Sequence, residues 1–209
     1  MKRFNFKTLG RTLSLAAVLV VGSVCVSNVG AQGTAGSGTF TDKRDGKTYK
    51  TVKIGKQTWM AENLNYQTKS GSLCYDNKES NCKKYGRLYE TGQTTLKNVC
   101  PAGWHLPSSQ EWKDLVLTAG GFDVAGKKLK SKSGWDGDGN GTDEFGFSAM
   151  PGGMNVEDFM SVGTKGSWWT ASAGNVYWYF SDGDEAHENY FEEDGGITSF
   201  LSVRCVQNN

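Results

Sequence analysis

An acidic loop in the second half of the chain has the residue spacing of a calcium-binding loop. Asp136, Asp138 and Asn140 stand at alternate positions and a glycine follows them, as in the D-x-D-x-N-G opening whose side-chain oxygens converge on Ca²⁺. The twelfth position of such a loop is a bidentate glutamate, but here it is Phe147. Two interpretations stay open: a calcium site completed by nearby carboxylates, and an ordinary acidic turn.

A run of aromatic side chains offers a different chemistry, the stacking of a flat ring on a sugar or on a protein partner. Residues 176–180 read Val-Tyr-Trp-Tyr-Phe, and alternate side chains of a strand point to opposite faces. Trp178 and Tyr179 would then face opposite ways, and a ring left exposed on a small sheet is a suitable platform for a ligand. The alternative is that long loops bury both faces. We expect at least one of Trp168 and Trp169 to belong to the core.

Other arrangements typical of catalysis are weak. Residues 182–194 hold seven acidic side chains, which would supply a glycosidase-type pair by chance, and we interpret them as a solvated loop. The chain has two histidines, His105 and His187, so a nucleophile–histidine arrangement has few candidates. We interpret His105 as structural, and the sequence predicts no catalytic residue.

The amino terminus has the pattern of an export signal. Residues 1–11 carry four basic residues and no acid, residues 13–21 are almost wholly apolar, and small side chains at positions 29 and 31 fit cleavage before Gln32. A spanning helix needs roughly 20 apolar residues, more than the apolar run here provides. We therefore expect a signal peptide over residues 1–31 and an exported protein without a membrane span, in the periplasm, at the cell surface or in the medium.

Four cysteines remain after that cleavage, and Cys25 leaves with the signal unless it is acylated. Cys74, Cys82, Cys100 and Cys205 are an even number in an oxidising compartment, which favours two disulfides. Of the three possible pairings, the spacing favours Cys74 with Cys82, around a polar loop, and Cys100 with Cys205. A zinc site is the rival interpretation, but no C-x-x-C pair is present.

Composition limits the partners. The chain has 209 residues, enough for one domain of ordinary size. Without the basic residues of the leader, 19 basic side chains face 22 acidic ones, and no Lys/Arg cluster supplies the charge footprint of a nucleic-acid-binding protein. We expect no nucleic acid as a partner.

Local patterns predict a mixed α+β domain. Residues 49–54 and 57–60 alternate like the strands of a hairpin. Ser108 followed by Glu111 is a capping box, and the apolar stripe after it predicts a helix that ends at Gly120 and Gly121. Further elements are expected at residues 124–129 (helix), 88–93 (a helical turn), and 145–150, 167–172, 176–181 and 200–206 (strands).

Six separated phrases carry a family resemblance. DGKTYKTVKIGKQTWMAENL, GRLYE, VCPAGWHLPSSQEW, GNGTDEFGFSAMPGG, WWTAS and SVRCV together resemble the Fibrobacter succinogenes major paralogous domain family, over about residues 42–206. Residues 32–41 would then be a flexible lead-in and residues 207–209 a tail. The resemblance implies an exported or surface-anchored bacterial protein.

A more distant resemblance implies a fold. Leu106-Pro107, Glu111-Trp112 and Val203-Arg204-Cys205 are similar to landmarks of formylglycine-generating, sulfatase-modifying domains, which have a C-type-lectin-like fold. The aerobic enzymes of that type bind copper through two cysteines after a GGSW-like strand, whereas Thr170 and Ala171 follow Trp169 here. The EPN and QPD sugar-binding triplets of lectins are also absent.

These observations favour an exported, non-catalytic surface, adhesion or binding domain, whose partner would be a polysaccharide or another surface protein. The alternative is an exported enzyme of unidentified type on a sulfatase-modifying-like scaffold that lacks the copper cysteines. No cofactor is expected other than the calcium that the acidic loop leaves open. The two functions differ in what they require, because an enzyme needs converging polar side chains in a pocket, whereas a binding domain needs only an exposed aromatic patch.

Overall fold

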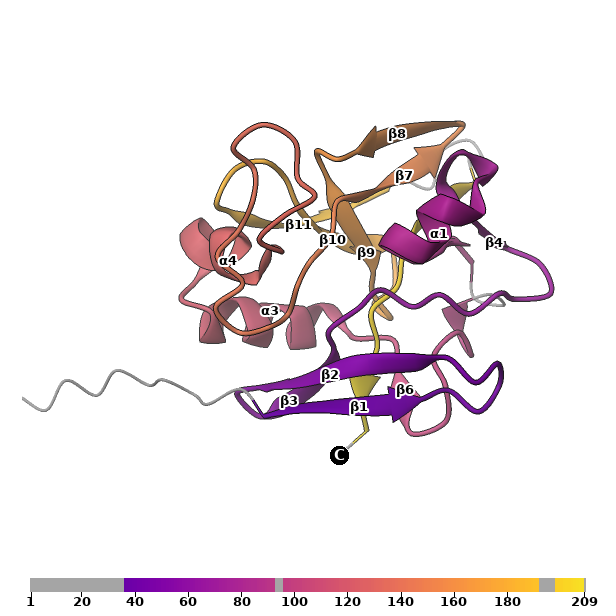
Figure 1. Cartoon of the computed structure of the whole chain (residues 1–209), viewed down its shortest axis with the longest axis horizontal. Coiled ribbons are helices and arrows are strands. Elements are labelled where there is room, and N and C mark those ends of the chain that lie inside the picture. Colours follow the sequence, from indigo (N-terminus) through magenta and orange to yellow (C-terminus); the bar gives the residue numbers. More distant parts are fainter. Residues whose placement is uncertain (1–35, 93–95, 192–197, 209) are drawn as a thin grey trace, which may run out of the picture. The chain divides into compact units, whose positions relative to one another are not determined.

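The structure, a computed structural model, describes residues 36–92, 96–191 and 198–208. The predicted signal peptide, residues 1–31, lies outside the described residues. In the described ranges the fold is a single mixed α+β domain with two mostly antiparallel sheets and three α-helices (Figure 1). No helix in these ranges is long and apolar enough to cross a membrane.

The first sheet joins the amino-terminal hairpin to the end of the chain. Its described strands, in spatial order, are β1 (Ser37–Thr41), β2 (Thr48–Ile54), β3 (Gln57–Met60), β13 (Val206–Gln207) and β6 (Trp104–His105). The β2–β3 hairpin confirms the predicted one, and Gly55 supplies its turn at a φ of 59°, a left-handed conformation that glycine adopts at little cost.

Two predicted domain boundaries differ from the ends of the strands in this sheet. Residues 37–41, expected in the flexible lead-in, form β1 and pair with β2 along their whole length. Gln207, expected in the tail, pairs with Trp104 because the terminal strand inserts between β3 and β6. The ordered domain therefore extends further than predicted at both ends.

The second sheet is larger. Its path in the described residues is β11 (Ala186–Tyr190), β10 (Val176–Phe180), β9 (Gly166–Trp169), β7 (Gly152–Val156), β12 (Ser199–Ser202), β5 (Leu88–Glu90) and β4 (Ser72–Leu73), and β8 (Asp158–Val162) pairs with β7. The β7–β9 and β9–β12 pairings are parallel and each consists of a single residue pair.

Several sequence-based assignments in this sheet are wrong. The expected helical turn at residues 88–93 is strand β5 over residues 88–90, because these residues pair with β12, far along the chain, and with β4; residue 93 lies outside the described residues. The expected strand at 145–150 is a loop with one isolated bridge at Ala149. Part of the acidic run, expected to be a loop, is strand β11 paired with β10. The β7–β8 hairpin was not predicted.

The helices are α1 (Glu79–Tyr85), α3 (Ser109–Thr118) and α4 (Phe122–Leu129), with a 3₁₀ turn at Tyr75–Asn77. The capping box of α3 is present: the Ser108 hydroxyl accepts the Glu111 N–H, and the Glu111 carboxylate accepts the Ser108 N–H. Helix α1 was not predicted, because most of its seven residues are polar and Lys78 at its N-cap makes no side-chain cap.

The main core lies where α3 meets both sheets (Figure 1). Trp112 of α3 is fully buried. Its ring lies 4.9 Å from that of Trp59 in the first sheet, and 5.6 Å and 6.4 Å from those of Trp168 and Trp178 in the second. Aromatic packing around one helix therefore connects the two sheets.

Candidate functional site

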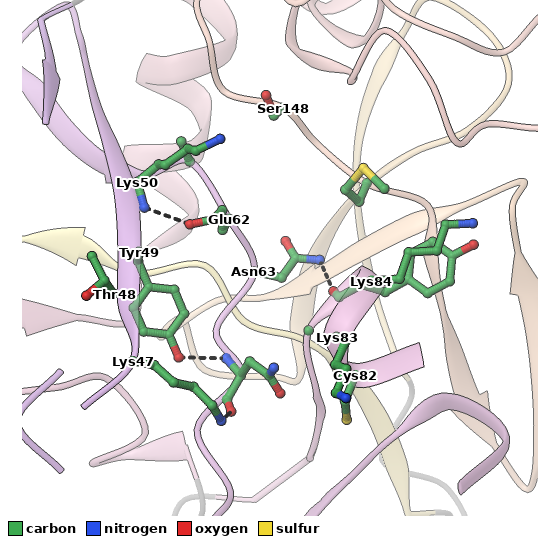
Figure 2. A pocket seen from close by; sticks show the side chains of 15 residues that line it. Lys47, Thr48, Tyr49, Lys50, Glu62, Asn63, Cys82, Lys83, Lys84 and Ser148 are labelled. Atoms are coloured by element: carbon green, nitrogen blue, oxygen red, sulfur yellow. Dashed lines mark hydrogen bonds between the residues drawn. The ribbon is translucent and has the colours of Figure 1, made fainter. Parts of the chain in front are cut away.

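A basic groove lies between β2 and α1. We call it the lysine groove, and its cavity volume is about 370 Å³. Figure 2 shows Lys47 and Lys50 on one side, Lys83 and Lys84 on the other, and Asn63 between them. Four lysines and a single carboxylate line it, so its charge is positive in a domain that is otherwise slightly acidic.

The lysines of the groove differ in their partners. Lys47 is held, because its ammonium group donates to the Asn65 carbonyl and lies 3.3 Å from the Asp45 carboxylate. Lys50, Lys83 and Lys84 are exposed and form no ion pair within the described residues. The Lys84 ammonium lies 4.7 Å from the centroid of the Tyr85 ring, so Lys50 and Lys83 are the two that are most available to a ligand.

The floor of the groove is a buried polar network centred on Asn63. Its Oδ1 accepts from the Trp168 indole at 2.8 Å and from the Arg204 guanidinium at 2.9 Å, and its amide donates to the Tyr85 carbonyl at 2.8 Å. Asn63 thus binds β9, the terminal segment and the end of α1 at one point. Gly86 is required beside it, because a Cβ there would lie 2.7 Å from the Asn63 Cβ.

Arg204 adds a buried cation beneath this floor. Its side chain is fully buried, and it donates to the Phe147 and Ser148 carbonyls as well as to Asn63. Burial lowers the pKa of Arg204 to about 9, although the negative charges of Asp143 and Glu62 act to raise it. The guanidinium is charged at neutral pH and has no carboxylate within ion-pair distance among the described side chains. It therefore contributes to the positive potential of the groove.

A second, more apolar hollow adjoins the lysine groove. We call it the Phe145 hollow, and its volume is about 560 Å³. Lys50, Ala61 and Ser148 line both spaces, while Phe145 and Val52 line only the second. An apolar surface with a half-buried aromatic ring therefore continues directly into the cationic one.

The loop that carries Phe145 is held firmly. The Asp143 carboxylate accepts both the N–H of Ser148, at 2.7 Å, and its hydroxyl, at 2.5 Å. Both residues have positive φ, 47° and 52°, which is uncommon for residues other than glycine. Because Arg204 also holds the Ser148 carbonyl, Phe145 is presented by a fixed turn.

The polar side chains of the predicted calcium loop make contacts within the protein. The Asn140 Oδ1 accepts the Trp135 N–H at 3.1 Å, so this oxygen already has a partner within the turn. Asp136 and Asp138 are exposed, and in the described ranges neither belongs to a cluster of three acidic, histidine or cysteine ligand atoms. The Asp136 carboxylate packs against Gly163 at the β8–β9 turn. Calcium binding by these residues stays a prediction.

The aromatic platform predicted on β10 does not have the expected exposure. Trp178 is 1% exposed and packs between Trp112 and Phe122. It cannot serve as an exposed platform, because α3 and α4 cover that face of the strand. Trp168 and Trp169 are both buried, which confirms the expectation that at least one belongs to the core.

Tyr179 is half-buried and its ring already has two neighbours. The His187 ring stacks on it at 4.9 Å, and the Lys165 ammonium lies 4.1 Å from its centroid. Burial lowers the pKa of Lys165. Neither Tyr179 nor Trp178 lines the lysine groove or the Phe145 hollow, so the structure does not bring the predicted platform to the site.

The four cysteines form the two predicted bridges, Cys74–Cys82 and Cys100–Cys205. Cys82 lines the lysine groove as part of its disulfide, so it offers no thiol there. Thr170 and Ala171, which stand where copper-binding cysteines would follow, lie after strand β9. No free thiol is present among the described residues.

His105 has a structural role. Its Nε2 lies 2.7 Å from Glu111 of the capping box, and its Nδ1 lies 2.7 Å from the Asn208 side chain. Burial alone would raise the pKa of Glu111, but the hydrogen bonds from Ser108 and His105 lower it overall. The cluster joins the start of α3 to β6 and the end of the chain.

Sequence reasoning missed the groove itself. Lys47 and Lys50 belong to the phrase GKTYKTVKIG, and Phe145 and Ser148 to the phrase EFGFSAM. Both phrases carry the family resemblance and both line the same hollow surface. The available signal was the alternation in β2, which places Lys50 on the exposed face of a strand whose neighbours Tyr49 and Thr51 are buried.

Comparison with known proteins gives one match. A family model described as the Fibrobacter succinogenes major domain matches residues 52–207, which is most of the chain. No curated protein matches the chain. No solved structure matches it either.

Proposed function

Because the chain belongs to the Fibrobacter succinogenes major domain family, we propose that it is an exported, non-catalytic binding domain that holds a polysaccharide in the lysine groove and the Phe145 hollow. The observation that carries this proposal is the junction of the two spaces, where Phe145 and Lys50 line one continuous surface. Sugar rings have apolar faces that pack on aromatic rings, and hydroxyl groups that bind polar side chains.

The polar groups of the site suit binding better than catalysis. Glu62, the carboxylate of the lysine groove, accepts the Lys50 N–H at 2.7 Å. The Ser148 hydroxyl has a carboxylate partner, Asp143, but the same carboxylate also fixes the Ser148 backbone, which is the pattern of a locked turn. A nucleophile needs a base poised to take its proton, and no histidine lines either space. No residue of either space therefore supports the enzyme alternative.

Two features support export. Disulfides persist in oxidising compartments and are rare in the cytosol, and this domain contains two of them. The export signal predicted over residues 1–31 agrees with that environment. We place the protein at the bacterial surface or in the medium, where a polysaccharide ligand is accessible.

The finer fold is part of the same proposal. A C-type-lectin-like arrangement is supported by α3 packed against short antiparallel strands, and by a terminal strand returned beside the amino-terminal hairpin. The Cys100–Cys205 bridge, which holds β13 to the segment that leads into β6, fits the expected base of such a domain. Fold alone assigns no ligand, so the binding proposal stands on the groove residues.

The test is retention of the purified protein on a panel of soluble and insoluble polysaccharides. We expect Phe145→Ala to weaken binding about fivefold or more, since stacking contributes about 1 kcal/mol. Tyr190→Ala is the matched control, because Tyr190 is 60% exposed and lines neither space. Equal retention of both variants, with unchanged melting temperatures, would refute the assignment of the site.

A further inference from the structure

The charge of the lysine groove specifies its ligand further. Resting on the proposed function, we infer that the groove binds an acidic polysaccharide, with carboxylate or sulfate groups held between Lys50 on β2 and Lys83 and Lys84 on α1, and a sugar ring of the same strand against Phe145.

Lys50, Lys83 and Lys84 form no ion pair, as is true of most of the described lysines, but these three also line a cavity. Lys78, Lys127 and Lys128 each lie within 4.0 Å of a carboxylate. Lys50 and Lys83 have no such neighbour in the described part of the chain, although both border a cavity. Both ammonium groups can therefore pair with an anionic group of a ligand.

The two walls of the groove carry like charges. Figure 2 shows the β2 lysines and the α1 lysines on opposite sides of Asn63, and Arg204 adds a buried cation below it. Like charges on facing walls repel one another, and an anion bound between them replaces this repulsion by attraction. A neutral sugar would leave this repulsion in place, so the arrangement favours an acidic one.

An acidic polysaccharide fits better than a nucleic acid. Outside the predicted leader the chain has more acidic than basic residues, so it lacks the extended basic surface that nucleic-acid binding normally uses. The basic surface is local, and the adjoining hollow is mostly apolar, with Val52 and Phe145 in its lining. A strand in which apolar ring faces alternate with acid groups matches both spaces.

The experiment compares four probes on the purified protein by affinity electrophoresis and calorimetry. Polygalacturonate carries carboxylates, dextran sulfate carries sulfates, dextran is neutral, and a single-stranded oligonucleotide carries phosphates. The groove variant is Lys50→Gln/Lys83→Gln/Lys84→Gln. The control is Lys56→Gln/Lys69→Gln/Lys113→Gln, which removes the same charge from exposed lysines that line neither space.

We expect polygalacturonate or dextran sulfate to bind at least about tenfold more tightly than dextran. We expect the groove variant to lose about tenfold in affinity and most of its salt dependence, because each exposed charge contact is worth roughly two- to threefold. The control variant should stay within about twofold of the wild type. The stronger of the two acidic polymers identifies the acid group.

Each other outcome overturns the inference in a distinguishable way. Equal binding of dextran and the acidic polymers, unaffected by the groove variant, refutes the charge preference but leaves polysaccharide binding standing. Preference for the oligonucleotide refutes it in favour of nucleic acid. Binding of no probe by the wild type refutes the inference together with the proposed function.

Discussion

Asn63 joins three parts of the fold through one amide group. Its oxygen accepts from Trp168 and Arg204, and its nitrogen donates to Tyr85. Arg204 is fully buried, and a buried charge that loses its hydrogen-bond acceptor is costly. Asn63 is therefore important to stability as well as to the shape of the groove floor.

A double-mutant cycle tests this network. We expect Asn63→Leu to lower the free energy of unfolding by about 3 kcal/mol, because it leaves Arg204 and the Trp168 indole without their acceptor. Arg204→Met should also destabilise, and the double variant should lose about 1–3 kcal/mol less than the two single losses combined, since the shared contact is lost once. Additive losses in urea unfolding would contradict direct coupling.

The exposure of Trp178 decides between a binding ring and a core ring. Trp178 is 1% exposed and packs on Trp112 and Phe122. We expect Trp178→Ala to lower the free energy of unfolding by about 3–5 kcal/mol through cavity formation. Tyr190→Ala, on the neighbouring strand but exposed, should stay within about 0.5 kcal/mol of the wild type. A small loss of unfolding free energy for Trp178→Ala in chemical denaturation would contradict the burial of the Trp178 ring.

Single residues also show what the sequence could predict. Alternation along β10 predicts that Trp178 and Tyr179 face opposite ways, but it does not say which face another element covers. That depends on α3 and α4, whose position is set by contacts distant in the sequence. The same limit applies to Phe145, because its loop is fixed by Arg204, which lies far along the chain.

Helix α3 is the element whose start is most completely specified. Ser108 and Glu111 cap it reciprocally, and His105 of β6 binds the same carboxylate. The hydrogen bonds to the carboxylate form fully only when Glu111 is ionised. The pKa of Glu111 is accordingly lowered in the folded state.

This lowered pKa predicts an acid-dependent contribution to stability. Because the folded pKa of Glu111 lies below its unfolded value near 4.5, the contribution is present above that value and is lost as the pH falls through the folded pKa. We expect Glu111→Gln to be less stable at neutral pH and to lose less stability than the wild type on acidification. Urea unfolding from about pH 7 to pH 3 measures this.

Asp114→Asn is the control on the same helix, since Asp114 is exposed and, among the described residues, its carboxylate accepts a hydrogen bond only from the Gln110 side chain. It should keep the wild-type loss of stability on acidification. Some acid dependence should persist in every variant, because the pKa of buried Asp42 is also lowered. Burial alone would raise that pKa, but the hydrogen bonds and the charge of Arg44 outweigh it. A Glu111→Gln variant with the wild-type slope would show that the capping box does not titrate as described.

Elements were predictable where their signals are local. The capping box and the β2–β3 hairpin turn are set by residues close in sequence, and both are present. Strand β5 has three residues and is defined by its pairing with β12, a partner more than a hundred positions away. Nothing within its own sequence distinguishes it from a helical turn. The β7–β8 hairpin was missed similarly, because its turn is made by Glu157 at a positive φ, without a glycine.

At the scale of the whole domain, the chain ends are tied together. Strand β13 inserts between β3 and β6, and Cys205 beside it is bonded to Cys100. This bond spans 105 residues, whereas Cys74–Cys82 spans 8. In the chain-entropy model a longer closed loop restricts the unfolded state more.

The two bridges should therefore differ in their effects. We expect Cys100→Ala/Cys205→Ala to lower the free energy of unfolding by about 4–5 kcal/mol, and Cys74→Ala/Cys82→Ala by about 2–3 kcal/mol. Chemical denaturation of the oxidised proteins measures both, and non-reducing peptide mapping of the wild type checks the pairing. A larger loss for the short bridge would contradict the entropic account.

The groove could not be predicted at this scale. Its walls come from β2 and α1, and its floor is Asn63, which is held by Arg204, 141 positions away. Helix α1 was itself missed, so Lys83 and Lys84 had no predicted place. Composition indicated only that the domain is slightly acidic, and this average conceals a local cluster of unpaired lysines.

The most direct test of the account is to locate the bound ligand by amide chemical-shift mapping of the isotopically labelled protein during titration with an oligogalacturonate. We predict the largest shifts at Lys50, Ala61, Phe145 and Ser148, which line the lysine groove and the Phe145 hollow, with smaller changes elsewhere. Shifts confined to the Tyr179 face of β10, or no saturable shifts for this or any other oligosaccharide, would contradict the claim that the groove is the binding site.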